Sequence, residues 1–293
     1  MHITNQKPVV LVTGSSRGIG RAIALQFAKN HYHVILNCST SLEQLENVKK
    51  EILALPDGSC TCCRCDVSDS SQVTAMFEEI STTCGQIDVL INNAGISHIG
   101  LFTDMTDDLW DRMIQTNLSS VFYCSRATLP SMISRKKGKI INISSMWGTV
   151  GASCEVAYSA AKSGIHGLTR ALAKELAPSN IQVNTIACGA IDTAMNAQLS
   201  PEERLALEED IPACRFGTPE EVASLAWDLA HAPAYMTGQI IGIDGGYILK
   251  PAFFYFSKSK SAYGRCSQNF LHIRNGYSLH FSHTHFFYNY RNL

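Results

Sequence analysis

Three side chains in the middle of the chain, a hydroxyl, a phenol and an ammonium, stand at spacings that could transfer a proton. Tyr158 and Lys162 are four residues apart, and Ser145 precedes Tyr158 by thirteen residues. On a helix, positions i and i+4 lie on one face, so the phenol and the ammonium are presented together. A nearby cation lowers the pKa of a tyrosine, which is ordinarily about 10. We therefore expect this pair to exchange a proton with a substrate oxygen that Ser145 holds by a hydrogen bond.

A glycine-rich turn near the N-terminus predicts a nucleotide-binding site. An apolar run over 9–12 leads into Thr13-Gly14-Ser15-Ser16-Arg17-Gly18-Ile19-Gly20, and a helical stripe follows it. Glycines between a strand and a helix let the backbone approach a pyrophosphate, which the helix N-terminus stabilises. The spacing departs from the usual G-x-G-x-x-G, and no Gly-Lys-Ser/Thr follows, so the turn is not a P-loop.

The end of the predicted second strand indicates which dinucleotide binds. Folds selective for NAD usually place an acid there to bind the ribose 2′-hydroxyl. This chain has Asn37-Cys38-Ser39-Thr40 instead, while Arg17 in the glycine turn can face a 2′-phosphate. We therefore expect NADPH (NADP) as the cofactor in preference to NADH.

Strand-like and helical segments alternate over the first 250 residues. Seven apolar runs are expected to be strands: 9–12, 33–37, 60–65, 89–92, 139–143, 182–186 and 240–243. A helix over 163–177 is expected to stop at Pro178, and the capping box Thr218-Pro219-Glu220-Glu221 starts another. This alternation predicts an α/β fold, in which residues 1–250 form a single-domain Rossmann-type doubly wound parallel sheet of about seven strands with helices on both faces.

Charge and composition divide the chain at residue 250. Residues 1–250 hold 19 Lys and Arg and all 25 Asp and Glu, for a net charge of −6, whereas residues 251–293 carry +5. An acidic main body argues against a nucleic-acid partner. We find neither a signal-peptide pattern nor an apolar stretch of the ~20 residues that cross a bilayer, so we expect no membrane association and a cytoplasmic location.

The last 43 residues form a tail of a different composition. Residues 251–293 hold 12 of the 25 aromatic residues and four of the ten His. Their apolar residues follow neither the two-residue period of a strand nor the 3.6-residue period of a helix for long. We expect a poorly ordered extension, a partner-binding segment or sequence with no selected role. A chain that ends at residue 250 is therefore expected to keep its activity.

The cysteine and histidine clusters do not predict a metal site. Cys60 and Cys62 are expected on one face of a strand, and Cys63 and Cys65 on the other, so the four thiolates cannot close one tetrahedral site. The histidines 280, 283 and 285 lie in the irregular tail. We expect no metal, and reduced cysteines that act as small hydrophobic residues.

Taken together, the motifs resemble the short-chain dehydrogenase/reductase family over residues 7–249. The residues that match are Thr13-Gly14-x-x-x-Gly18-x-Gly20, Asp66, Asn92-Asn93-Ala94-Gly95, Asn117, Ser145, Tyr158-x-x-x-Lys162 and Asp244-Gly245-Gly246. The resemblance implies reduction of a carbonyl, in which Tyr158 protonates the oxygen as hydride reaches the carbon. It also implies that Lys162 lowers the pKa of Tyr158 and holds the nicotinamide ribose, that Ser145 stabilises the alkoxide, and that Asn117 holds a water beside Lys162.

The resemblance implies the cofactor contacts as well. Asp66 and Asn92 would contact the adenosine half, and Thr193 would hold the carboxamide. Many members have Pro-Gly where this chain has Cys188-Gly189, which loosens the local turn. The residues expected to bind NADPH are Gly14, Ser16, Arg17, Gly18, Ile19, Gly20, Asp66, Val67, Asn92, Ala94, Tyr158, Lys162, Ile191 and Thr193.

Within the family, the chain is most similar to the 3-oxoacyl-carrier-protein reductases, through residues 13–21, 117–122 and 215–221. This implies NADPH-dependent reduction of a 3-oxoacyl thioester on acyl-carrier protein, in fatty acid biosynthesis, by a homotetramer. Those enzymes bind the acidic carrier partly through basic residues. One such position falls at Lys136 and another at Ser179, which is not basic.

Two alternatives stay open. Residues 146–158 look like a subgroup that reduces a 5-aminopentanone group on a lysine of elongation factor P, in which Trp147, Cys154 and Glu155 would line the substrate mouth and Glu155 would attract an amine. The other is a non-catalytic NADPH-sensing regulator, although such proteins usually lose the Tyr or Lys that this chain keeps. The segment 194–212 is expected to act as a lid over the substrate.

Overall fold

Seven parallel strands form one sheet in the order β3-β2-β1-β4-β5-β6-β7. The computed structural model describes residues 7–197 and 199–249, and the predicted tail lies outside them. The strands are β1 (Val9–Val12), β2 (His33–Cys38), β3 (Ser59–Arg64), β4 (Val89–Asn92), β5 (Gly138–Ser145), β6 (Ile181–Cys188) and β7 (Ile240–Ile243). The order reverses between β1 and β4, so the predicted doubly wound sheet is confirmed.

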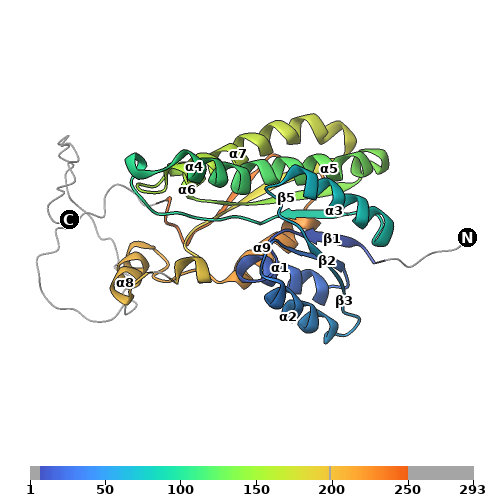
Figure 1. Cartoon of the computed structure of the whole chain (residues 1–293), viewed down its shortest axis with the longest axis horizontal. Helices are drawn as coiled ribbons and strands as arrows, with labels where there is room; N and C mark the ends of the chain where they lie inside the picture. The colour runs from blue at the N-terminus through green and yellow to red at the C-terminus, as the bar shows by residue number, and fades with distance from the viewer. Residues whose placement is uncertain (1–6, 198, 250–293) are drawn as a thin grey trace, which may run out of the picture. The chain divides into compact units, whose positions relative to one another are not determined.

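Helices cover both faces of this sheet (Figure 1). One layer contains α1 (Gly18–Lys29), α2 (Leu42–Leu53) and α9 (Pro219–His231), and the other contains α3 (Ser70–Thr83), α5 (Ser120–Arg135) and α7 (Val156–Leu176). Shorter helices are α4 (Asp107–Ile114), α6 (Trp147–Val150) and α8 (Pro201–Asp210), with a π-helical turn over Gln115–Ser119 and 3₁₀ turns over Phe102–Asp104, Ala177–Ser179 and Ala194–Asn196. In the described ranges, no helix is both long and apolar enough to cross a membrane.

Each helix layer packs against its own face of the sheet. On one face, Phe27 of α1 is buried in the same cluster as Val222 of α9. On the other face, Ile80 of α3 is buried in a second cluster with Met132 of α5. The predicted alternation along β3 is confirmed: Cys60 and Cys62 pack on the first cluster, whereas Cys63 and Cys65 belong to the second. The part of the chain that the structure describes contains no group of three or more residues able to hold a metal ion.

The elements that carry the candidate chemistry are longer than their sequence patterns indicated. Helix α7 begins at Val156, seven residues before the predicted start, so that Tyr158 and Lys162 lie in its first turns. Strand β5 continues two residues beyond the predicted end because Ser144 and Ser145 pair with the equally extended β6. Both serines are polar and therefore do not extend an apolar pattern. At α9, the predicted capping box is confirmed by reciprocal hydrogen bonds between Thr218 and Glu221.

Candidate active site

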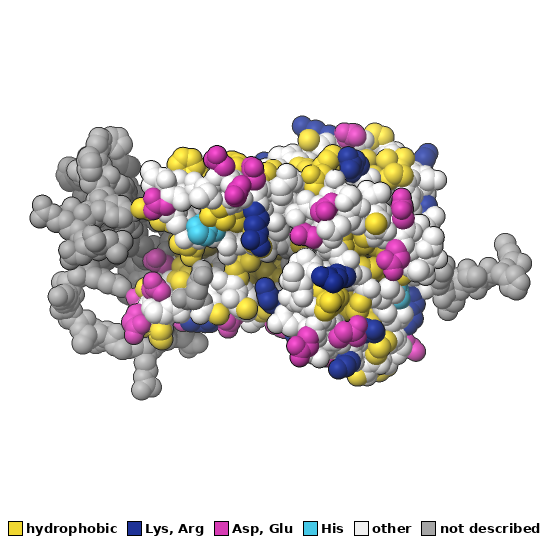
Figure 2. Space-filling model, viewed as in Figure 1, with side chains coloured by type: hydrophobic (Ala, Val, Ile, Leu, Met, Phe, Trp, Pro, Cys, Tyr) yellow, Lys and Arg dark blue, Asp and Glu magenta, His cyan; other side chains and the backbone are white. Residues whose placement is uncertain are grey.

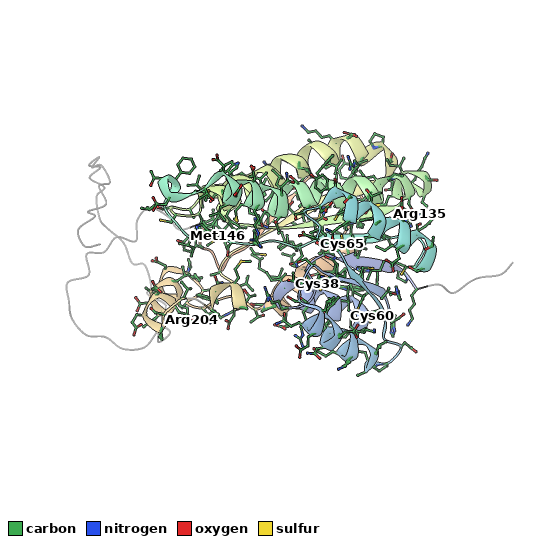
Figure 3. All side chains as sticks on the ribbon, in the orientation of Figure 1. Cys38, Cys60, Cys65, Arg135, Met146 and Arg204 are labelled. Carbon is green, nitrogen blue, oxygen red and sulfur yellow. The ribbon has the colours of Figure 1, made fainter. Side chains whose placement is uncertain are left out.

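The catalytic candidates meet at the carboxyl edge of the sheet, beyond the end of β5. Ser145 is the last residue of β5, and Met146, labelled in Figure 3, follows it. Ser145 Oγ accepts a hydrogen bond of 3.1 Å from the Trp147 amide, and the serine side chain lies close enough to Tyr158 to oppose the rise in the pKa of the phenol. Because α7 packs on β5, the serine and the tyrosine reach one point from two elements, as the sequence predicted.

Lys162 lies behind Tyr158, in the interior. Only 4% of its surface is exposed, and its Nζ donates a hydrogen bond of 3.0 Å to the carbonyl of Ile143. Nζ is 5.4 Å from the centroid of the Tyr158 ring. The ammonium is therefore fixed by β5 and faces the phenol ring from one side.

Burial dominates the pKa of Tyr158, so the lowering expected from Lys162 stays a prediction. Burial raises the pKa of Tyr158, the Cys188 thiol and the Glu155 carboxyl raise it further, and only the hydrogen bond with Ser145 opposes them. Burial also lowers the pKa of Lys162 to about 8, against the influence of Cys188. Desolvation disfavours both charged forms, the phenolate and the ammonium. Tyr158 consequently holds its proton at neutral pH, as an acid in a reduction must.

Asn117 occupies the π-helical turn between α4 and α5, and its side chain is wholly buried. Its Nδ2 donates to the carbonyls of Met113 and Ile96, at 3.0 Å each. A Cβ placed on Gly95 would lie 2.7 Å from Asn117 Oδ1 and 3.6 Å from Lys162 Nζ. Only a glycine leaves this space open, so the chain brings Asn117 and Lys162 to one place, as predicted. Such widened turns recur at functional sites.

The glycine turn lies against the two other segments predicted to bind the cofactor. Gly14 has a φ of +63°, and a Cβ there would be 2.9 Å from the Cα of Ala94. Gly18 has a φ of +53°, and a Cβ there would be 3.4 Å from Cγ2 of Thr193. A ligand can thus come close to the backbone of the turn at the N-terminus of α1, between Ala94 and Thr193. This arrangement fits an extended dinucleotide with its pyrophosphate at the turn.

Two asparagines outside the expected set fix this turn. Asn93 Nδ2 donates to the carbonyls of Thr13 and Gly14, at 2.9 and 3.0 Å. Asn37 is 1% exposed, and its Oδ1 accepts a hydrogen bond of 3.2 Å from the Gly14 amide. A polar residue inside an apolar strand is the sequence signal that marks Asn37.

Two of the predicted cofactor residues have side chains committed elsewhere. Asn92 is 4% exposed and donates to Asn142 at 2.8 Å, so its side chain braces the interior between β4 and β5. Val67 belongs to the core. Only the backbone atoms of Asn92 and Val67 can therefore contact the adenosine half of the cofactor. Asp66 follows β3 at the carboxyl edge, where its Oδ1 accepts hydrogen bonds from the amide and hydroxyl of Ser68.

The remaining cofactor candidates lie where the sequence placed them. Arg17 is exposed and immediately precedes α1. Ser16 and Ile19 are partly buried on the turn, whereas Ile191 is buried and pairs with Gly217 in an isolated bridge.

The departure at Cys188-Gly189 keeps the backbone turn. A Cβ on Gly189 would lie 2.6 Å from the Cα of Asp244, so a glycine is required. The carbonyl of Cys188 accepts a hydrogen bond of 2.8 Å from the Met146 amide, and this bond joins β6 to the segment after Ser145. This hydrogen bond fixes the backbone at Cys188, where many members of the family have a proline.

Aromatic and acidic side chains lie next to the catalytic candidates. The rings of Trp147 and Tyr247 meet edge to face, with their centroids 5.6 Å apart. Glu155 is partly buried; burial raises the pKa of its carboxyl, and a hydrogen bond with the Trp147 side chain opposes that shift. Figure 2 shows hydrophobic side chains in the hollow between α8 and the layer of α4 and α7.

Comparison with known proteins decides the family. A family model described as short chain dehydrogenase matches residues 8–204. The chain belongs to the short-chain dehydrogenase family. It is 42% identical over 237 residues to the 3-oxoacyl-acyl-carrier-protein reductase FabG of Staphylococcus aureus, covering 80% of this chain and 96% of the relative. It is 36% identical over 238 residues to the uncharacterized oxidoreductase YmfI of Bacillus subtilis, covering 81% and 97%.

Solved structures agree with this membership. This short-chain dehydrogenase superimposes on a short-chain type dehydrogenase/reductase from Mycobacterium marinum with a TM-score of 0.78 and 34% identity, covering 83% of this chain and 96% of that one. The chain is therefore an NAD(P)-dependent oxidoreductase, and its family membership supports reduction of a carbonyl.

Proposed function

We propose that this short-chain dehydrogenase uses NADPH to reduce a 3-oxoacyl thioester on acyl-carrier protein, as a cytoplasmic homotetramer in fatty acid biosynthesis. The observation that carries the proposal is the meeting of Ser145, at the end of β5, with a protonated Tyr158 on α7, with Lys162 behind the phenol. The proposed substrate is inferred from the relatives that are named 3-oxoacyl-acyl-carrier-protein reductases.

The residues divide the reaction among them. NADPH, when bound, supplies the hydride that reaches the carbonyl carbon. The electron pair of the C=O π bond moves onto the oxygen, which takes the proton of Tyr158 and becomes the alcohol. Ser145 Oγ accepts a hydrogen bond from the Trp147 amide, and its hydroxyl hydrogen can turn to donate to that oxygen when the substrate is bound. The charge of Lys162 stabilises the phenolate that is left.

A kinetic assay with NADPH tests the reaction. We expect NADPH to be consumed with an acetoacetyl thioester and the product to be the 3-hydroxy thioester, and we expect Tyr158→Phe to abolish turnover. Tight NADPH binding without turnover on any ketone would favour the regulator. Gel filtration of the full chain tests the tetramer.

Lys136 is our candidate for docking the carrier protein. It ends α5 in a left-handed conformation, and its carbonyl accepts a hydrogen bond of 3.0 Å from Asn180 Nδ2, next to Ser179. Of its two basic neighbours, Arg135 is occupied by Asp88 in a 2.8 Å ion pair. We expect Lys136→Glu to raise KM for the carrier-bound thioester and to leave KM for the free acetoacetyl thioester unchanged. An equal change for both substrates would count against docking at this residue.

Glu155 favours a second candidate, reduction of a 5-aminopentanone group on elongation factor P. Its partly buried carboxyl lies close enough to Tyr158 to raise the pKa of the phenol, and among the described residues it forms no ion pair. A substrate ammonium could meet that charge beside the ketone. Comparing kcat/KM for an acyl thioester and an aminoketone decides between the candidates. We expect Glu155→Gln to lower only the aminoketone value.

A further inference from the structure

We propose that Tyr247 is a positioning residue for Ser145 and acts on it through Trp147, an inference that rests on the proposed reduction at the Ser145–Tyr158 site. Ser145 is the last residue of β5, and Trp147 is the first residue of α6. Met146, labelled in Figure 3, separates them. Tyr247 lies after β7, near the end of the described chain. A side chain from a remote part of the sequence thus reaches the segment that directly follows the serine.

The hydroxyl of Ser145 is oriented by the backbone amide of Trp147. This amide donates a hydrogen bond of 3.1 Å to Ser145 Oγ, and Ser145 is 7% exposed. Such a bond weakens steeply as its angle departs from linear, so the rotamer of the serine depends on where Trp147 lies. A displacement of ~1 Å at a group that meets the substrate can lower the rate by about 100-fold. The position of Trp147 is therefore a condition for polarising the substrate carbonyl.

Two side chains hold the indole of Trp147. The ring of Tyr247 meets it edge to face, with the centroids 5.6 Å apart and the planes at 84°, which is a preferred arrangement for an aromatic pair. The indole also lies close enough to the Glu155 carboxyl to oppose the rise that burial causes in the pKa of that carboxyl. Helix α6 is only four residues long, and a single turn is not stable by its own hydrogen bonds. The start of α6 therefore depends on contacts made by its side chains.

Tyr247 is itself held on a rigid turn. The Asp244 carboxylate accepts hydrogen bonds of 3.0 Å from the amides of Gly246 and Ile248. The Tyr247 amide donates one of 3.2 Å to the Asp244 carbonyl. Asp244 also packs on Gly189, directly after β6, where a Cβ would lie 2.6 Å from the Cα of Asp244. Because these bonds and this close contact fix the turn against the sheet, Tyr247 can hold Trp147 in place.

A double-mutant cycle separates positioning of Ser145 from a general loosening of the site. The full chain is assayed with NADPH and an acetoacetyl thioester. We expect Tyr247→Ala to lower kcat roughly fivefold, which corresponds to the loss of one aromatic pair, and to change KM less. Tyr247→Phe keeps the ring and should keep kcat within about twofold of the wild type. In a Ser145→Ala background, Tyr247→Ala should cause no further loss, because the group that it positions is absent.

A matched control is available on another surface. Tyr235→Ala removes a fully exposed ring from the segment after α9 and should leave kcat unchanged in both backgrounds. Circular dichroism verifies the fold of each variant. Tyr247→Leu, which keeps apolar bulk without the ring, replaces Tyr247→Ala if that variant does not fold, and the same loss is expected of it.

Three results would overturn the inference. An equal loss in both backgrounds would mean that Tyr247 does not act through Ser145. A loss in Tyr247→Phe as large as in Tyr247→Ala would assign the effect to the hydroxyl, and an unchanged kcat in both variants would leave Tyr247 without a role in the reaction. A wild-type chain that reduces no ketone would overturn the proposed function itself, and this inference with it; that result differs from the other three, which all require an active wild type.

Discussion

The ammonium of Lys162 lies 5.4 Å from the ring centroid of Tyr158, and its hydrogen bond goes to the carbonyl of Ile143. The Ser145 side chain lies close enough to the phenol hydroxyl to oppose the rise in its pKa. The lysine thus acts on the tyrosine through space, from a position that β5 fixes. This geometry leaves the phenol protonated at rest and stabilises the anion that forms once the proton has moved to the substrate.

Replacement of Tyr158 by phenylalanine removes the proton donor and keeps the ring. We expect Tyr158→Phe to lower kcat for ketone reduction by at least ~100-fold, the usual contribution of a general acid. The Kd for NADPH, measured by fluorescence titration, should change little, since the glycine turn and Thr193 are intact. A comparable loss of NADPH affinity would show that the phenol chiefly holds the cofactor.

The rate of reduction should fall as the pH rises through about 8. Burial lowers the pKa of Lys162 to about 8, so its charge is present below that pH and lost above it. Tyr158 stays protonated over the same interval because burial raises its pKa. In a pH–rate profile, Lys162→Arg should move the alkaline limb to higher pH, because a guanidinium keeps its charge. An unmoved limb would assign the titration to another group.

The strands were predictable because a local apolar pattern marks each of them. Apolar runs and the capping box at Thr218 gave seven strands and the start of α9 to within a few residues. Their ends were less predictable, since Ser145 and Cys188 extend β5 and β6 only by pairing with each other.

In the candidate site, the residues could be predicted but the balance of forces could not. Spacing placed Tyr158 and Lys162 on one helix, but whether attraction or desolvation wins depends on burial by distant segments. The same applies to Asn92, whose partner Asn142 is 50 residues away along the chain.

His166 should make the fold sensitive to acid. It is 4% exposed on α7, its Nε2 has no hydrogen-bond partner among the described residues, and burial, with smaller contributions from Arg170 and Lys162, lowers its pKa to about 4. The unfolded chain takes up this proton near pH 6.5, whereas the folded chain resists until about pH 4. Stability is therefore present above pH 6.5 and lost as the pH falls through this window, by roughly 2 kcal/mol at pH 5.

Urea denaturation at pH 7 and pH 5 measures this loss. The difference in unfolding free energy between the two pH values should shrink in His166→Leu, whatever the variant's stability at pH 7. The control His31→Asn changes an exposed histidine at a φ of 64°, which asparagine tolerates, and should leave the difference unchanged. If His166→Leu keeps the full difference, the acid sensitivity belongs to other groups.

Arg204 joins the predicted lid to the cofactor side of the site. Helix α8 has no buried residue of its own, so its attachment depends on contacts that leave its side chains partly exposed. Arg204, labelled in Figure 3, pairs with Asp192 at 3.0 Å and with Glu208 at 3.1 Å. Its guanidinium also lies 4.3 Å from the ring centroid of Phe216, which is buried. Asp192 directly precedes Thr193, so a contact on α8 reaches the segment expected to hold the carboxamide.

We expect Arg204→Gln to raise KM for the ketone about fivefold, with a smaller change in kcat, because an exposed ion pair and a cation–π contact are each weak. Arg204→Lys keeps the charge but loses the planar fork, so its KM should lie between those of Arg204→Gln and the wild type.

The control Lys49→Gln breaks an ion pair on α2 whose basic side chain is 37% exposed, against 38% for Arg204, and it should leave KM unchanged. Steady-state kinetics at low and high salt provide the measurement, since screening should raise the wild-type KM toward that of Arg204→Gln. A KM that is the same in all four proteins would show that α8 is positioned without Arg204.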